Sequence, residues 1–237
     1  MDMKKRHILI IIICLIFSNL LLAENHRPKI GLALSGGGAL GFAHVGILEK
    51  IDSLGIPIDY LTGTSMGGLV GALYASGYSS QELVDFARET NWEALFSDKP
   101  PRSQLPYFEK VDVHKYQFKI GISETNKPEK LGLIEGQNIE LLFSRLTSNY
   151  ATEKDFDKLE IPFRCMAVDI LTGNEVLLSE GPLANAMRST MSVPSIFSPV
   201  VYGDSLLIDG GILNNMPVDV ARDMGADFVL AVSVRNP

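Results

Sequence analysis

The sequence predicts an α/β domain with three layers, in which helices cover both faces of a mostly parallel central sheet. Short apolar runs alternate with segments of helical periodicity along the chain, as is typical of parallel strands buried on both faces. The chain has 237 residues, and we expect 24–237 to form one domain with its core at about 29–234. A domain of this size can bury a sizeable hydrophobic core.

The first part of the chain gives the clearest alternation of strands and helices. We expect the following elements there: strands at 29–35 and 58–63, and helices at 43–55, 66–76 and from Ser79 onwards. Gly55 supplies a C-terminal stop, and Ser79 with Glu82 forms a capping box. Gly68 and Gly71 would let their helix approach the sheet closely.

Residues 90–135 interrupt this alternation with a segment rich in proline and polar residues. Within it, 116–120 and 131–136 suggest a short hairpin. We favour an ordinary surface loop for the segment. The alternative is a mobile cap over the site, in which Trp92, Tyr107 and Phe108 meet acyl chains.

The alternation resumes at Gly136. The later elements that we expect are a helix after Gly136, a hairpin of 163–170 with 174–180, a helix at 183–190, a strand at 205–211, a helix at 217–224 and a strand at 227–234. No repeat or linker divides the chain, which supports a single domain.

Residues 1–23 have the pattern of a secretory signal peptide. A basic segment of Lys4, Lys5 and Arg6 precedes an apolar run at 8–22 and a small residue, Ala23. We therefore expect export to the periplasm, the outer membrane or the medium. An uncleaved anchor is the alternative, and lipidation of Cys14 is disfavoured because the residue before it is not small.

Charge and cysteine content limit the partners and the bonds of the exported chain. The net charge is −7, and the leader carries three positive charges and one negative, so residues 24–237 have a net charge of −9. This balance argues against a nucleic-acid partner, which calls for clustered lysine and arginine. Cys165 is the only cysteine after the leader, so no internal disulfide is expected.

The stretch G-T-S-M-G at 63–67 places Ser65 between two glycines, Gly63 and Gly67, after a strand and before a helix. This G-x-S-x-G pattern is typical of a sharp strand-to-helix turn that exposes a serine as a nucleophile. A serine hydroxyl needs a base to accept its proton.

The glycine-rich stretch at 36–41 has two interpretations. Gly36, Gly38 and Gly41 fit G-x-G-x-x-G, and Asp59 follows at the distance of a ribose-binding acid, so a nucleotide-binding module is one alternative. Glycines near a helix N-terminus also present N–H groups to an oxyanion. Because G-T-S-M-G follows at the next strand, we assign Gly36, Gly37 and Gly38 to an oxyanion hole.

The histidines are poor candidates for the base. His7 lies in the leader and His26 in the N-terminal tail, His44 is expected to be packed in a helix, and His114 falls in the irregular segment. A triad with His114 is therefore disfavoured.

A carboxylate is the alternative base. Asp209 ends an apolar strand, and Gly210 and Gly211 turn the chain away directly after it. In a parallel sheet Ser65 and Asp209 would both lie at carboxyl ends of strands, where such sheets place their sites. Asp169 is better suited to shaping a hairpin turn, and Asp59 begins the strand before Ser65 rather than ending it.

With its glycine loop, its G-x-S-x-G turn and its D-G-G sequence in that order, the chain resembles the patatin-like phospholipases. The resemblance runs from about Lys29 to Val234 and includes the stretch 186–200. The expected leader makes it similar to secreted bacterial members. The resemblance implies a patatin-like fold and a Ser–Asp dyad without histidine, in which Ser65 attacks and Asp209 accepts the proton.

The resemblance also implies hydrolysis of phospholipid or other acyl esters through an acyl-enzyme, with transient contact to a membrane surface. A small-ester esterase and an acyltransferase remain alternatives with the same dyad. No metal or other cofactor is expected, because the sequence has no His/Cys/Asp cluster at metal-ligand spacing. Leu40 stands where many relatives have arginine or lysine, which leaves the head-group preference open.

Overall fold

The computed structural model describes residues 27–96 and 132–234. The expected leader, His7, His26 and His114 lie outside these ranges, as do Tyr107, Phe108 and the expected strand 116–120.

A mixed sheet of seven strands forms the centre of the described domain, in the order β7-β8-β4-β2-β1-β9 with β5 also paired to β4. Its strands are β1 (Ile30–Leu34), β2 (Tyr60–Thr64), β4 (Phe163–Asp169), β5 (Glu175–Leu178), β7 (Val200–Tyr202), β8 (Ser205–Asp209) and β9 (Phe228–Val232). A separate pair joins β3 (Gly132–Ile134) to β6 (Ser195–Phe197) in parallel. The residue before β3 and the expected strand 116–120 lie outside the described ranges, so the predicted hairpin is not tested.

The sheet has a parallel half and an antiparallel half that share β4. Strands β9, β1, β2 and β4 pair in parallel. Strands β5 and β8 both run antiparallel to β4, and β7 runs antiparallel to β8. The predicted hairpin of β4 with β5 is thus confirmed. The expectation that the strand before Asp209 belongs to the parallel set is wrong, since the chain enters β8 by a tight turn from β7.

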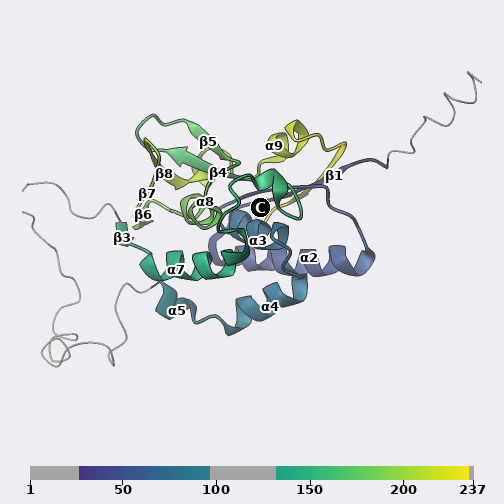
Figure 1. The fold of residues 1–237 in the computed structure, drawn as a ribbon, viewed down its shortest axis with the longest axis horizontal. Coiled ribbons are helices and arrows are strands. Elements are labelled where there is room, and N and C mark those ends of the chain that lie inside the picture. The colour runs from purple at the N-terminus through teal and green to yellow at the C-terminus, as the bar shows by residue number, and fades with distance from the viewer. Residues whose placement is uncertain (1–26, 97–131, 235–237) are drawn as a thin grey trace, which may run out of the picture.

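The described helices are α2 (Ala43–Leu54), α3 (Met66–Ala75), α4 (Ser80–Glu89), α5 (Trp92–Leu95), α7 (Gln137–Leu146), α8 (Leu183–Thr190) and α9 (Val218–Asp223). Figure 1 shows α2, α3, α4, α5 and α7 gathered below the strands and α9 above them. A side chain at Gly71 of α3 would meet Leu61, and one at Gly31 of β1 would meet Ala221 of α9. Leu61 pairs with Leu32, the neighbour of Gly31, and successive residues of a strand face opposite sides, so α3 and α9 pack on opposite faces of the sheet. The predicted three-layer arrangement is confirmed.

Local signals explain where two of these helices begin or end. Gly55 ends α2 in the left-handed conformation, with φ of 62°, which glycine adopts without steric cost. Ser79 caps α4, and the reciprocal bonds of the predicted capping box with Glu82 are both present. Among the helices of the described residues, none is both long and apolar enough to cross a bilayer.

Candidate active site

Strands β2 and β8 end at neighbouring residues of β4. Thr64, the last residue of β2, pairs with Met166, while Asp209, the last residue of β8, pairs with Ala167. The two strands run in opposite directions, so their C-terminal ends point toward each other. Ser65 follows Thr64 directly, and the turn after β2 therefore faces the end of β8.

Ser65 occupies a strained turn between β2 and α3. Its φ of 55° and ψ of −125° lie outside the regions that a serine usually adopts, and it is only 7% exposed. A side chain at Gly63 would come within 2.5 Å of the Gly67 carbonyl oxygen, and one at Gly67 within 2.4 Å of the Leu34 carbonyl oxygen. Both glycines of the predicted pattern are thus required by close backbone packing.

The backbone of Ser65 is held by Thr190, at the end of α8. The N–H group of Ser65 donates to the Thr190 hydroxyl over 2.9 Å, and that hydroxyl donates to the Met166 carbonyl oxygen over 2.6 Å. Thr190 is fully buried. It therefore ties the strained turn to β4. Nothing in the local sequence identified Thr190, because its role depends on a contact between residues 125 positions apart.

Asp209 lies beside Ser65 in a buried position. The Ser65 side chain lies close enough to the Asp209 carboxylate to favour its charged form, and this carboxylate accepts from the N–H group of Gly211 over 2.7 Å. Burial raises the pKa of the Asp209 carboxyl above its ordinary value, and these two interactions only partly offset the rise. A buried carboxylate with a raised pKa is a stronger base than an exposed one.

The two glycines of the D-G-G sequence stand where a side chain would not fit. A side chain at Gly210 would come within 2.5 Å of the Met166 backbone, and one at Gly211 within 3.0 Å of the Asp209 carboxylate. The backbone N–H of Asp209 donates to the Ser192 carbonyl oxygen over 2.9 Å. Asp209 is thus held through its backbone by Ser192 and through its carboxylate by Gly211.

The glycine loop lies beside Ser65. A side chain at Gly36 would come within 3.0 Å of the Ser65 Cβ, and one at Gly41 within 2.3 Å of Met66. The N–H group of Gly36 donates to the Asn215 carbonyl oxygen over 3.1 Å. Within residues 27–96 and 132–234, the N–H groups of Gly37 and Gly38 have no hydrogen-bond acceptor. Of the three predicted donors, Gly36 thus has its N–H group engaged with Asn215, whereas those of Gly37 and Gly38 are not engaged with another described residue.

The segment after the D-G-G sequence holds the parts of the site together by hydrogen bonds. The sequence analysis did not identify this segment. The Asn215 side chain donates to the Gly36 carbonyl oxygen over 3.4 Å. The hydroxyls of Thr62 and Thr64, both on β2, donate to the carbonyl oxygens of Pro217 and Asn214 over 2.9 and 2.8 Å. These bonds hold 214–217 against both the glycine loop and β2.

The other candidate bases have structural roles. His44 is fully buried in α2, and its Nε2 bonds the Ser35 carbonyl oxygen at the base of the glycine loop over 2.8 Å. Burial lowers the pKa of His44. Asp169 accepts from the N–H groups of Leu171 and Leu206, as expected of a turn-shaping residue.

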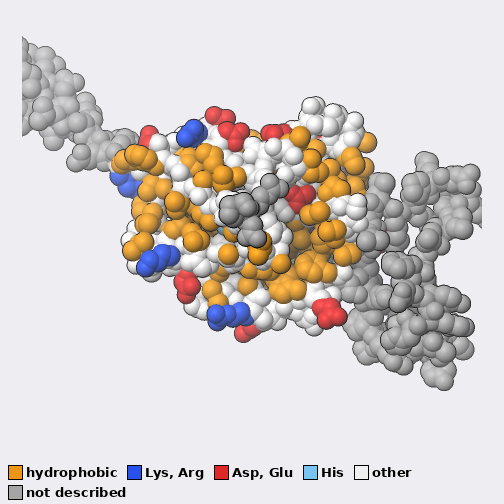
Figure 2. Space-filling model, turned by 180° about the vertical axis from the view of Figure 1, so that it is seen from behind, with side chains coloured by type: hydrophobic (Ala, Val, Ile, Leu, Met, Phe, Trp, Pro, Cys, Tyr) orange, Lys and Arg blue, Asp and Glu red, His pale blue; other side chains and the backbone are white. Residues whose placement is uncertain are grey.

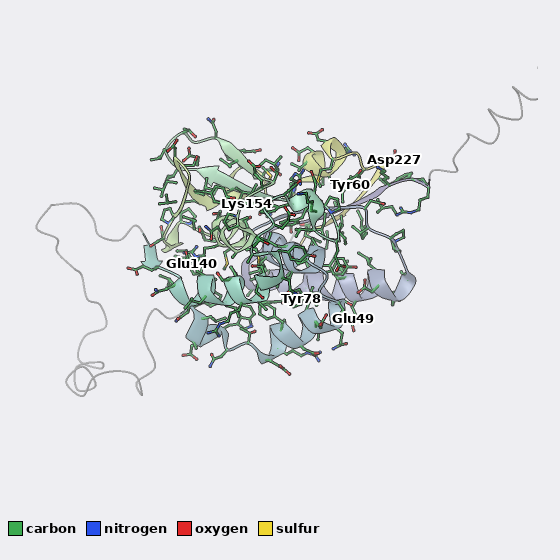
Figure 3. All side chains as sticks on the ribbon, in the orientation of Figure 1. Glu49, Tyr60, Tyr78, Glu140, Lys154 and Asp227 are labelled. Atoms are coloured by element: carbon green, nitrogen blue, oxygen red, sulfur yellow. The ribbon has the colours of Figure 1, made fainter. Side chains whose placement is uncertain are left out.

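Asp59 lies at the opposite end of β2, where Arg27 binds it through two bonds of 2.7 Å. Figure 3 shows Tyr60 and Asp227 at this end, beside the start of β1. A surface hollow of about 670 Å³ lies there, lined by Arg27, Pro28, Lys29, Gly225, Asp227 and Phe228. None of these lining residues is a serine, threonine or cysteine, and the hollow lies at the amino ends of the strands, away from Ser65. We therefore place the site at Ser65 because of the side chains gathered there, and not at the hollow because of its volume.

The loops of the site carry exposed apolar side chains. Leu40 is 57% exposed on the glycine loop, and Ile212, Leu213 and Met216 are exposed just after the D-G-G sequence. Figure 2 shows apolar side chains over much of one face of the molecule. Trp92, which the alternative of a cap would place against acyl chains, packs against Phe42 with a ring separation of 4.8 Å.

Comparison with known proteins gives one family. The profile described as "Patatin-like phospholipase" matches residues 32–222. Patatin-like phospholipase domain-containing protein ZK370.4 of Caenorhabditis elegans is 33% identical over 208 residues, which are 86% of this chain and 13% of that protein. Lysophospholipase NTE1 of Debaryomyces hansenii is 29% identical over 213 residues, which are 88% of this chain and 12% of that protein. The chain thus spans about one-eighth of the length of these relatives.

A solved structure shares the fold. The crystal structure of VipD from Legionella pneumophila superposes with a TM-score of 0.52 and 15% sequence identity, covering 81% of this chain and 47% of that one. Similarity at this level of identity concerns the arrangement of strands and helices alone.

Proposed function

Because the chain belongs to the patatin-like phospholipase family, we propose that it hydrolyses the acyl ester of a phospholipid or lysophospholipid, with Ser65 as nucleophile and Asp209 as proton acceptor. The observation that carries this proposal is the closeness of the Ser65 side chain to the buried Asp209 carboxylate, which it influences electrostatically. It supplies a base to the strained serine, while the candidate histidine of the described chain bonds elsewhere.

In the first step, Ser65 Oγ forms a bond to the substrate carbonyl carbon as its proton passes to Asp209. The carbonyl π electrons move to oxygen, and the N–H groups of Gly37 and Gly38 donate to this oxyanion. When the oxyanion collapses, the bond to the alcohol oxygen breaks, and the proton on Asp209 passes to that oxygen. The alcohol, a lysophospholipid or a glycerophosphodiester, leaves and an acyl-enzyme remains.

In the second step, a water molecule attacks the acyl-enzyme while Asp209 accepts its proton. The bond to Ser65 Oγ breaks, the proton returns to that oxygen, and a fatty acid is released. The raised pKa of Asp209 suits a group that must both accept and return a proton. The sequence supplies all groups for this cycle, so the proposal needs no cofactor.

Two further parts of the proposal concern where the enzyme acts. The exposed apolar side chains on the loops of the site support transient contact with a lipid surface, which brings the ester to Ser65. The pattern of residues 1–23 supports export from the cytoplasm. Fractionation of cells that produce the full chain tests export, and recovery in the cytoplasm alone contradicts it.

The alternative functions would use the same loops for another reaction, another substrate or another ligand. An acyltransferase would pass the acyl group from Ser65 to another alcohol, and an esterase of small substrates would prefer short acyl chains. Product analysis with added acyl acceptors, and rates across a series of chain lengths, separate these activities. Nucleotide binding by the glycine loop is less well supported, because Gly36 N–H is occupied and Gly41 packs against Met66.

The proposal is tested with the Ser65→Ala variant of the full chain, an alkyl fluorophosphonate and a p-nitrophenyl acyl ester. Wild type should be labelled at Ser65, and Ser65→Ala should lose labelling and at least about a thousandfold in turnover. Ser80→Ala is the matched control, because Ser80 is as buried as Ser65 (6% and 7% exposed) but lies in α4. Hydrolysis by Ser65→Ala at the wild-type rate would refute the assignment.

A further inference from the structure

Arg188 is a charged side chain enclosed inside the domain. It lies in the last turn of α8 and is 1% exposed, although a buried guanidinium loses its hydration. Such a group is retained only where other atoms replace the lost water, and it often fixes a particular arrangement of the segments around it.

The guanidinium group of Arg188 binds three separate segments. Its Nη1 donates to the Ser192 hydroxyl over 2.6 Å. Its Nη2 donates to the carbonyl oxygens of Glu135 and Ser198 over 2.8 and 3.1 Å. The Phe197 ring lies 5.1 Å below the guanidinium carbon, at a distance that gives a cation–π contact. One side chain thus joins the loops before α7 and after β6 to the end of α8.

Ser192 connects this arginine to the site. Its hydroxyl accepts from Arg188 and donates to the Arg188 carbonyl oxygen over 2.8 Å. Its own carbonyl oxygen accepts the N–H of Asp209. Between them lies Thr190, which holds the N–H of Ser65. The segment 188–192 therefore contacts the backbones of both Ser65 and Asp209, and Arg188 anchors that segment.

We propose that Arg188 is a positioning residue that sets the alignment of Asp209 with Ser65 through the segment 188–192. This inference rests on the proposed function for its effect on turnover, but the structural link does not depend on it. Loosening the segment should misalign the carboxylate while leaving substrate binding unchanged, because Arg188 is 1% exposed and presents no surface to a substrate.

The geometry requires arginine rather than any cation. The planar guanidinium presents several N–H groups in fixed directions, so it can bind Ser192, Glu135 and Ser198 together. A lysine at this position carries the same charge but has one small donor group. Arg188→Lys should therefore keep the charge and lose part of the anchor.

The test uses Arg188→Lys, Ser192→Ala and the double variant in the full chain. We expect each single variant to lower kcat for the acyl ester at least fivefold with KM within a factor of two. The kcat of the double variant should be no lower than that of the worse single variant, because both substitutions disrupt the same contact between Arg188 and Ser192. Arg164→Lys is the control. Arg164 lies at the start of β4, is largely buried and binds Asp157.

Hydrogen–deuterium exchange gives a readout that is independent of catalysis. In Arg188→Lys and Ser192→Ala, peptides covering 205–211 should exchange faster than in wild type, while Arg164→Lys should leave them unchanged. Unchanged kcat in folded Ser192→Ala, losses that multiply in the double variant, or unchanged exchange at 205–211 would each overturn the proposal. If Arg188→Lys does not fold, Ser192→Ala alone decides. Wild type that fails to hydrolyse esters refutes the proposed function, and the exchange result still tests the link.

Discussion

The two halves of the sheet support the candidate site in different ways. The parallel half supplies Ser65 and the glycine loop, and it holds them by backbone packing in which glycines are essential. The antiparallel half supplies Asp209, whose N–H group donates to the segment after α8 and whose carboxylate accepts from Gly211. Close backbone packing is needed there too, but only at Gly210. Strand β4 is common to both halves, and the two groups meet where β2 and β8 end along it.

Because of this difference, we expect the two halves to respond differently to substitutions. In the parallel half an added methyl group collides with backbone atoms, which cannot move without disturbing the strands. In the antiparallel half the loss of one hydroxyl removes a link but leaves the packing intact. Changes to the first region should therefore affect folding most, and changes to the second should affect the alignment of the site.

The largest expected effect on stability is that of Gly67→Ala. The new Cβ would lie 2.4 and 2.5 Å from the carbonyl oxygens of Leu34 and Ser35, so α3 or β1 must shift. We expect a loss of at least about 3 kcal/mol, the upper end of the usual cost of overpacking. Gly46→Ala is the control, because nothing lies within 4 Å of its added Cβ. It should gain up to about 1 kcal/mol from helix propensity. Urea unfolding measures both, and similar stabilities would contradict the comparison.

A smaller effect is expected for Thr190→Val, which keeps the shape and removes the hydroxyl. The N–H of Ser65 and the carbonyl of Met166 would both lose this partner, which should cost about 1–3 kcal/mol. Turnover should fall roughly tenfold as the strained turn relaxes. Thr147→Val is the matched control, since Thr147 is also buried but its hydroxyl donates to the Phe143 carbonyl oxygen of α7 instead. Equal kcat values for the two variants would refute the role of Thr190.

The smallest effect, and one of opposite sign, is expected for the stability of Asp209→Asn. Burial raises the pKa of Asp209 in the folded state above the ordinary value of 3.8, so the folded protein holds this proton more tightly than the unfolded chain does. The wild type thus loses stability relative to Asp209→Asn as pH rises through the raised pKa, and the difference disappears below 3.8. Melting temperatures from pH 3 to 7 test this. A variant that is less stable than wild type at pH 7 would contradict it.

The parallel half was largely predictable from the sequence. Continuous apolar runs predicted β1 and β2, which are buried from their second residue to their last, and the glycines of G-T-S-M-G predicted the turn at Ser65, because each signal is local. The capping box at Ser79 and the stop at Gly55 fixed helix boundaries to within a residue. Such features depend on neighbouring residues, and a single sequence contains them.

The antiparallel half was less predictable. Strands β6 and β7 have three residues each, too few to show a period, and the direction of β8 follows from its turn with β7. No local sequence pattern predicts the contacts that Thr190, Asn215 and Arg188 make with distant segments. The sequence identified Asp209 because two glycines follow an apolar strand there, although it did not indicate how β8 meets β2.

The central claim is that Asp209 activates Ser65, and the rate of fluorophosphonate labelling of Ser65 tests it most directly. We measure this rate against pH in wild type and in Asp209→Asn. The wild-type rate should rise with pH as Asp209 ionises, with a midpoint above 3.8, since burial raises the pKa of this carboxyl. Asp209→Asn should react at least about a thousandfold more slowly, without that rise. Labelling of Asp209→Asn at the wild-type rate, with the same pH profile, would contradict the account.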